Sequence, residues 1–181
     1  MDSSPGKAGT QSLQAPRRNS DGNLALRASG PLPSQGNRVR FAGYAAIFDR
    51  PDRGGDVIRK GAFAASLGKG EAVPLLWQHK AGAVIGRIEH LSEDRRGLRV
   101  IAALGEGADA ARAAKLVRSG RLDGLSFGYR VREAGRSGGL RELRKLELVE
   151  VSLVAEPMQP KARVHAVDSE TDSYSTRRVS V

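Results

Sequence analysis

Apolar and polar residues alternate along much of the chain from residue 39 onward, and this period of two is typical of β-strands with one buried face. In the first such stretch, Val39 and Phe41 alternate with Arg40 and Ala42. The same signal predicts strands over residues 39–48, 56–58, 72–79, 84–91, 98–104, 122–131 and 140–154. Two of them, 84–91 and 98–104, flank a polar turn and are predicted to form a hairpin.

Two helices are predicted among these strands. Residues 60–67 carry Phe63 and Leu67 four positions apart, which indicates a short helix. Residues 109–119 are alanine-rich with one apolar stripe, and Gly120 ends this second helix. The chain is therefore predicted to have a mostly β fold with peripheral helices, an antiparallel β-barrel or sandwich.

Three segments differ in composition. Residues 1–37 are rich in Ser, Gly, Pro, Asn and Gln, which favours a disordered basic arm because so few large apolar side chains cannot offset the ordering of the chain. Residues 38–167 carry the strands and helices and are predicted to form one domain. Residues 168–181 are rich in Ser and Thr and are predicted to form a flexible C-terminal tail.

The formal net charge is +10, which raises nucleic acid or an acidic surface as a partner. Most of this charge lies between residues 39 and 167 rather than in the terminal segments. Its densest cluster is Arg141, Arg144 and Lys145, which is interleaved with glutamates and has no aromatic side chains that would stack on bases. We interpret the charge mainly as a solvated face, and nucleic acid is not expected as a specific partner.

The chain has 0 cysteines, which excludes disulfides and thiolate metal sites. It has neither an apolar run of about eighteen residues nor an apolar segment near Met1 that resembles a signal peptide. These features predict a soluble protein that is not exported and has no membrane partner.

The stretch 122–131 isolates one hydroxyl group. As a strand it would direct Leu125 and Phe127 to one face and Ser126 and Gly128 to the other. Glycine inside a strand often marks a bulge or the close approach of another backbone, such as a peptide substrate. An ordinary edge strand with a solvated serine is the plainer interpretation of the same residues.

Two further residues would complete a nucleophile, a base and an orienting acid with Ser126. His79 closes one predicted strand, where it would share a face with Leu75 and Trp77, and Glu150 lies in another strand. Imidazole titrates near neutral pH and can take the hydroxyl proton, while a carboxylate fixes the imidazole tautomer. Spacing along the chain does not establish such a relay, and a packed or exposed histidine with an ion-paired glutamate is the plainer interpretation of these residues.

Several short motifs follow one another in a characteristic order. They are Gly43-Tyr-Ala-Ala-Ile-Phe-Asp49, Gly55-Asp-Val-Ile58 with Gly61-Ala-Phe63, Leu75-Leu-Trp-Gln-His79 followed by Ile85-Gly-Arg87, Gly124-Leu-Ser-Phe-Gly-Tyr129, and Leu148-Val-Glu-Val-Ser-Leu-Val154 with Pro157. This ordered set resembles the caudovirus prohead proteases, the capsid-maturation serine proteases of tailed phages and of phage-derived gene transfer agents. One departure is Pro157-Met-Gln-Pro160, where the family usually has a Pro-Ala-Asn pattern.

The resemblance implies the fold of the herpesvirus assemblin proteases, a mostly antiparallel barrel ringed by helices. It also implies catalytic roles, with Ser126 as the nucleophile, His79 as the general base and Glu150 as the third member. Glu147 competes with Glu150 for the third place. The other two histidines, His90 and His165, lie outside the family motifs.

The resemblance further implies a function. It is cleavage of the scaffolding segment of the major capsid protein, or of a separate scaffold, inside an immature capsid in the cytoplasm of a bacterial host, together with self-processing. A homodimer, contacts with the portal and capsid shell, and the absence of any cofactor or metal are also expected. Two alternatives stay open: a catalytically inactive capsid-assembly factor of the same fold, and a basic nucleic-acid-binding barrel.

Overall fold

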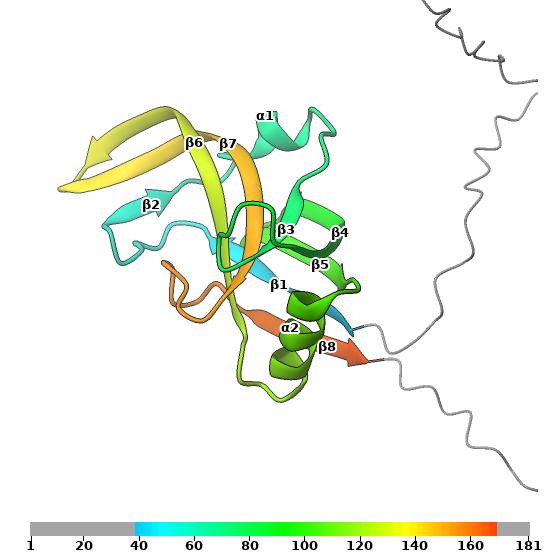
Figure 1. The fold of residues 1–181 in the computed structure, drawn as a ribbon. Helices are drawn as coiled ribbons and strands as arrows, with labels where there is room; N and C mark the ends of the chain where they lie inside the picture. Colours follow the sequence, from blue (N-terminus) through cyan, green and yellow to red (C-terminus); the bar gives the residue numbers. More distant parts are fainter. Residues whose placement is uncertain (1–38, 170–181) are drawn as a thin grey trace, which may run out of the picture. The chain divides into compact units, whose positions relative to one another are not determined.

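Figure 1 shows the computed structural model, which describes residues 39–169. Its elements in chain order are β1 (Val39–Ile47), β2 (Asp56–Ile58), α1 (Ala64–Leu67), β3 (Pro74–Trp77), β4 (Val84–Glu93), β5 (Gly97–Leu104), α2 (Ala108–Arg118), β6 (Gly124–Ser137), β7 (Leu140–Val154) and β8 (Val164–Ser169). Every predicted strand is present. The predicted N-terminal arm, residues 1–37, lies outside the described residues. β8 is an additional strand, and it runs two residues past the predicted end of the domain at residue 167.

The eight strands form one sheet in the order β2-β7-β3-β4-β5-β1-β8, and β6 pairs with β7 outside this path. The sheet curls around the core (Figure 1), and the prediction of a mostly β fold is confirmed. Most neighbouring strands are antiparallel, including the predicted hairpin of β4 and β5, but β2 and β3 each pair with β7 in parallel. Periodicity does not reveal these parallel pairings, because side chains alternate in the same way in both kinds of sheet.

β7 is the strand that organises the sheet. It is 15 residues long, which lets β2 pair with its beginning and β3 with its end. β6 pairs with its other edge along almost the whole length. β3 and β6 therefore lie on opposite edges of the same part of β7. The residues that follow β3 and the residues of β6 consequently come close to that part of β7.

One hydrophobic cluster fills the inside of the curled sheet. Its largest fully buried side chains are Phe41, Phe63, Leu75, Ile85, Leu98, Leu125, Leu143, Leu146 and Leu153. Burying one side chain of this size stabilises the fold by about 1.5–3 kcal/mol relative to exposing it. α2 adds Ala110, Ala113 and Val117, all buried, which confirms the predicted apolar stripe of that helix.

Two elements differ from their predicted bounds because of glycine. α1 begins at Ala64 rather than at residue 60, since Gly61 has a φ of 88° and turns the chain before the helix. β6 extends beyond its predicted end at residue 131 and stays paired with β7 as far as Ser137, and Gly138 and Gly139, with φ values of 54° and 83°, reverse the chain. Two consecutive left-handed residues are what a tight two-residue hairpin requires.

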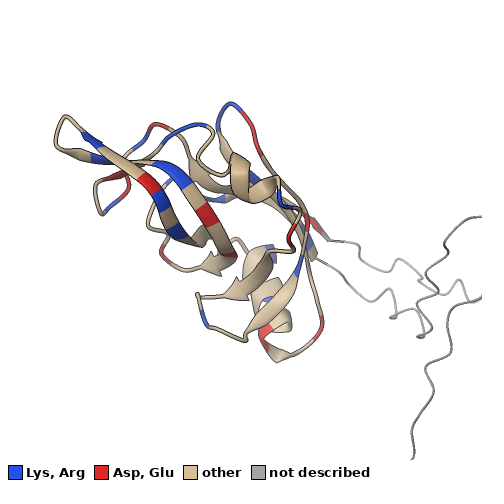
Figure 2. Ribbon diagram, turned by 90° about the horizontal axis from the view of Figure 1, so that it is seen from above, with Lys and Arg blue, Asp and Glu red and all other residues tan. Residues whose placement is uncertain are grey.

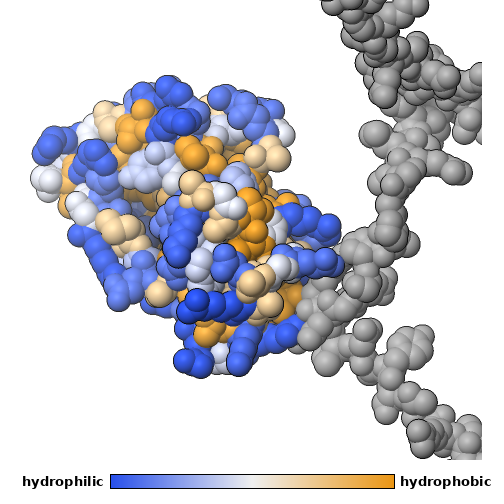
Figure 3. All heavy atoms as spheres, in the orientation of Figure 1, coloured by the Kyte–Doolittle hydropathy of each residue, from blue (hydrophilic) through white to orange (hydrophobic). Residues whose placement is uncertain are grey.

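The positive charge of the basic cluster on β7 is balanced by neighbouring carboxylates. Its three ion pairs are Arg141 with Asp56, Arg144 with Glu142 and Lys145 with Glu133. Figure 2 shows basic and acidic residues interspersed along the β6–β7 hairpin, and Figure 3 shows hydrophilic residues around one face with apolar patches between them. This mixing of signs agrees with the interpretation of the charge as a solvated face.

Candidate active site

His79 lies on a tight turn, not on a strand. β3 ends at Trp77, and Gln78 and His79 follow with left-handed φ values of 51° and 57°. The amide of Lys80 donates to the carbonyl of Trp77 at 2.9 Å, which closes the turn. The prediction that His79 shares a strand face with Leu75 and Trp77 is therefore wrong, because the turn redirects its side chain.

The end of β7 holds this turn in place. The amide of Gln78 donates to the carbonyl of Leu153 at 3.0 Å, and the amide of His79 donates to Oγ of Ser152 at 3.1 Å. The Gln78 side chain in turn accepts from the amide of Ala155 at 3.3 Å. Left-handed residues other than glycine cost about 1–3 kcal/mol each and persist where surrounding contacts fix them. The three bonds to β7 and the residue after it supply such contacts.

The imidazole of His79 meets the carboxylate of Glu150. Nδ1 of His79 lies 2.6 Å from Oε1 of Glu150, and Oγ of Ser152 donates to the other carboxylate oxygen at 2.6 Å. The Glu150 side chain is 9% exposed, whereas that of His79 is 45% exposed. Nε2 of His79 makes no hydrogen bond within residues 39–169. A histidine that donates from Nδ1 to a carboxylate keeps its lone pair on Nε2, as a general base must.

Ser126 lies on β6, the strand next to β7, and its side chain is on the same face of the sheet as that of Ser152. In the antiparallel β6–β7 pair Ser126 is opposite Ser152, and Gly128 is opposite Glu150. Directly opposite residues of such a pair point to the same side, about 4.5–5.5 Å apart. Ser126 is 7% exposed, so it is not the solvated serine of the plainer interpretation, although β6 is an edge strand. Its hydroxyl makes no hydrogen bond in the described part of the chain.

Gly128 makes room for the carboxylate. A Cβ atom built on Gly128 would lie 2.7 Å from Oε1 and 3.0 Å from Cγ of Glu150, which is closer than such contacts occur. The carboxylate thus lies over β6 at Gly128, two residues from Ser126, and the imidazole of His79 contacts this carboxylate. No hydrogen bond joins His79 to Ser126 in this structure.

The competing acid is elsewhere. Glu147 forms ion pairs with Arg130, at 2.9 Å, and with Arg132. The hydrogen bond from Arg132 lowers the pKa of the Glu147 carboxyl. The structure brings Glu150, and not Glu147, to His79.

The other two histidines also lie apart from this site. Nε2 of His90 is 2.8 Å from Oγ of Ser92 on the same strand, and the ring of His165 packs edge-on against Tyr44. Burial lowers the pKa of His165. Neither ring contacts Ser126.

Sequence reasoning did not single out Ser152. A signal for it exists, since Ser152 lies two positions after Glu150 on a strand, and alternation places both on one face. Only the fold shows that the turn after β3 reaches this face, because β3 pairs with β7 in parallel.

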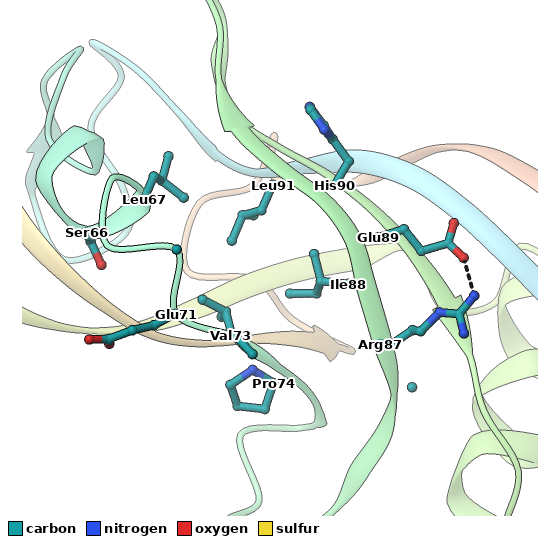
Figure 4. Close-up of a pocket in the computed structure, with 13 residues that line it drawn as sticks. Ser66, Leu67, Glu71, Val73, Pro74, Arg87, Ile88, Glu89, His90 and Leu91 are labelled. Carbon is teal, nitrogen blue, oxygen red and sulfur yellow. Dashed lines mark hydrogen bonds and ion pairs between the residues drawn. The ribbon is translucent and has the colours of Figure 1, made fainter. Parts of the chain in front are cut away.

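Two hollows lie near these elements. A cavity of about 100 Å³ adjoins Ser126, and Phe127, Ile58 and Gln159 also line it. A groove of about 460 Å³ lies between α1, the start of β3 and β4 (Figure 4), and contains none of the three predicted catalytic residues. Of these two hollows, the smaller one adjoins Ser126, the predicted nucleophile.

Within residues 39–169, no group of three or more His, Cys, Asp or Glu side chains is arranged to hold a metal ion. No helix in that range is long and apolar enough to cross a membrane.

A serine and a carboxylate on one face of a curled sheet, with a histidine from a turn bound to the carboxylate, are side chains that serine peptidases use. The sequence comparison identifies the family: the chain belongs to the caudovirus prohead serine proteases, whose family model matches residues 23–177. A curated relative is the prohead protease of Enterobacteria phage HK97, which is 33% identical over 99 residues. That match covers 53% of this chain and 44% of the relative, so the chain spans less than half of the relative's length there.

Similar structures have been solved. The capsid assembly protease of bacteriophage T4 matches with a TM-score of 0.50 at 13% identity, over 64% of this chain and 82% of that one. The protease of varicella-zoster virus matches with a TM-score of 0.46 at 16% identity, over 72% of this chain and 64% of that one. The T4 likeness supports the assignment of the fold.

Proposed function

We propose that this protein is a serine endopeptidase of capsid maturation, with Ser126 as the nucleophile, His79 as the general base and Glu150 as the residue that orients the base. The observation that carries this proposal is the 2.6 Å contact of His79 Nδ1 with Glu150 Oε1, next to the strand that bears Ser126. The membership of the chain in the prohead serine protease family supports it.

In the proposed mechanism, Nε2 of His79 takes the hydroxyl proton as Ser126 Oγ attacks the carbonyl carbon of a peptide bond. Glu150 stabilises the imidazolium that forms, because its carboxylate already accepts a hydrogen bond from Nδ1–H. His79 then gives the proton to the leaving amine, and a water molecule hydrolyses the acyl-enzyme by the same steps. Proton transfer by a positioned base accelerates such reactions by about 10²–10⁴.

The contact between Nε2 of His79 and Oγ of Ser126 is expected to form when a peptide binds. Hydrogen bonds between catalytic groups are often long in free enzymes and shorten in the complex with substrate. The side chain of His79 is 45% exposed, which leaves its free nitrogen accessible. One hydrogen bond at Nδ1 lets the ring adjust while it stays attached to Glu150.

The proposed substrate is the scaffolding segment of a major capsid protein, or a separate scaffold protein, within an immature capsid in the bacterial cytoplasm. This choice follows from the family resemblance, and the name of the HK97 relative, a prohead protease, supports an action during capsid assembly. Self-processing, assembly as a homodimer, and contacts with the portal and capsid shell belong to the same proposal.

Labelling with a fluorophosphonate serine probe tests the nucleophile. Wild type should be labelled and Ser126→Ala should not, while Ser137→Ala, an exposed serine on the same strand, should behave as wild type. Co-expression with the neighbouring capsid protein, followed by intact mass measurement, tests the substrate. Undiminished labelling of folded Ser126→Ala would overturn the proposal, and an unlabelled but folded wild type would favour an inactive assembly factor.

A further inference from the structure

Ser152 occupies a central position that the proposed relay does not use. Its side chain is 0% exposed, on the strand to which both β3 and β6 are paired. Its Oγ donates to Oε2 of Glu150 at 2.6 Å and accepts from the backbone amide of His79 at 3.1 Å. One hydroxyl thus contacts both members of the pair that we propose to activate Ser126.

We propose that Ser152 is a positioning residue, which holds the carboxylate of Glu150 and the backbone of His79 in the geometry that the reaction needs. This inference rests on the proposed function. A hydroxyl has one proton to donate and lone pairs to accept with. Because that proton goes to Glu150, the oxygen of Ser152 is left to accept from His79, and both bonds form at once.

The two bonds fix different degrees of freedom. The bond to Glu150 fixes the carboxylate, whose second oxygen then faces Nδ1 of His79. The bond from the amide of His79 fixes the left-handed turn, where φ is 57° at this residue. Without the hydroxyl, both the side chain of the acid and the backbone of the base would lose a contact at the site itself.

The same contacts separate the roles of the two serines that face each other across β6 and β7. Ser152 has its proton committed and no exposed surface, whereas the hydroxyl of Ser126 makes no hydrogen bond within residues 39–169. A nucleophile must reach the substrate and lose its proton to the base. Ser126 is therefore the nucleophile, and a serine probe should modify Ser126 and leave Ser152 unmodified.

The test compares Ser152→Ala with Ser66→Ala in the full-length protein. Ser66 is a matched control, because its Oγ also accepts a backbone amide of β7, that of Leu148 at 3.0 Å, but does not contact Glu150. Displacement of catalytic groups by about 1 Å can slow a reaction about 10²-fold. Ser152→Ala should therefore lower kcat about 10²-fold with KM little changed, and Ser66→Ala should leave kcat unchanged.

Two further measurements distinguish positioning from stability. In ¹H NMR the Nδ1 proton of His79, hydrogen-bonded to Glu150, should give a strongly deshielded signal in wild type. This signal should weaken or move upfield in Ser152→Ala and stay unchanged in Ser66→Ala. Ser152→Cys, which has nearly the same volume but a weaker donor, should give an intermediate kcat. If Ser152→Ala does not fold, Ser152→Cys serves as the test in its place.

The outcomes are separable. An active Ser126→Ala variant would overturn the proposed function itself. If Ser126 is essential while folded Ser152→Ala or Ser152→Cys keeps the kcat of wild type, only the positioning role is overturned. Loss of kcat in Ser66→Ala equal to that in Ser152→Ala would also overturn it, because the effect would then be one of general stability.

Discussion

Nδ1 of His79 lies 2.6 Å from Oε1 of Glu150, although 71 positions separate the two residues along the chain. The parallel pairing of β3 with β7 makes this contact, since Leu76 pairs with Ser152 just before the turn that carries His79. The turn then folds the imidazole back over β7. The proposed base and the proposed acid thus meet through strand pairing, while Ser126 reaches the same face from β6.

Glu150→Gln should abolish most of the activity while the fold persists. An amide in place of the carboxylate no longer fixes the productive tautomer of His79 or stabilises its charged form, which in comparable relays lowers kcat about 10⁴-fold. Glu147→Gln is the matched control, since this residue forms ion pairs with Arg130 and Arg132 of β6. The measurement is kcat/KM on a peptide that spans the cleavage site. Equal losses in the two variants would contradict the assignment of the third residue.

Gly128→Ala should lower activity through the carboxylate of Glu150. The added methyl group would lie 2.7 Å from Oε1, so this oxygen, which contacts Nδ1 of His79, must shift. A displacement of about 1 Å is expected to slow turnover about 10²-fold. Gly135→Ala is the control on the same strand, because its methyl group would meet only the flexible guanidinium of Arg144, at 2.9 Å. Peptidase rates and thermal unfolding of both variants provide the measurement, and an unchanged rate in Gly128→Ala would refute the expectation.

Gln159→Leu should destabilise the fold. The Gln159 side chain is 5% exposed, donates to the carbonyls of Ile47 and Arg50, at 2.7 Å and 3.1 Å, and accepts from the amide of Ile47. Leucine leaves these backbone groups without partners, and each buried unsatisfied group costs about 1–3 kcal/mol. We expect a loss of about 2–4 kcal/mol in urea unfolding. The neighbouring Met158, 52% exposed, is the control, and Met158→Ala should change the free energy of unfolding by less than about 0.5 kcal/mol.

Asp56→Asn should reduce stability in a pH-dependent way. The hydrogen bond from Arg141, opposed in part by burial and aided by Tyr129, lowers the pKa of the Asp56 carboxyl. A carboxyl whose pKa is lower in the folded state stabilises the protein above its unfolded pKa, near 3.9, and loses that contribution as the pH falls through the folded value. Because Arg141 is 47% exposed, we expect a difference of about 1 kcal/mol near neutral pH.

Urea unfolding of wild type and Asp56→Asn between acidic and neutral pH measures this difference. It should shrink towards zero below the folded pKa of Asp56. Arg141→Gln removes the partner of the carboxylate, so it should show the same dependence on pH. A difference that stays constant down to the acid limit would argue against the ion pair as its cause.

The strands were predictable because their signal is local. Alternation in residues 39–48 or 98–104 reflects only which side chains face the core, and the structure has β1 and β5 there. The same pattern placed Ser126 and Glu150 on faces opposite to their apolar neighbours Leu125 and Val151, and both neighbours are 0% exposed. The left-handed residues Gln78 and His79 gave no comparable signal, since neither is a residue type that turn chemistry favours.

From the order of its residues alone, this chain specifies a strand-rich fold, a family, a candidate serine and histidine, and two candidate acids on one strand. The family motif already favoured Glu150 over Glu147, whereas the contact of Glu150 with His79, the direction of the His79 side chain and the contacts of Ser152 came from the folded arrangement. The physical reason is that periodicity records the burial of each residue with respect to its neighbours in sequence. Which strands pair, in which direction and in what register depends on contacts between distant segments, and in this protein those contacts assemble the site.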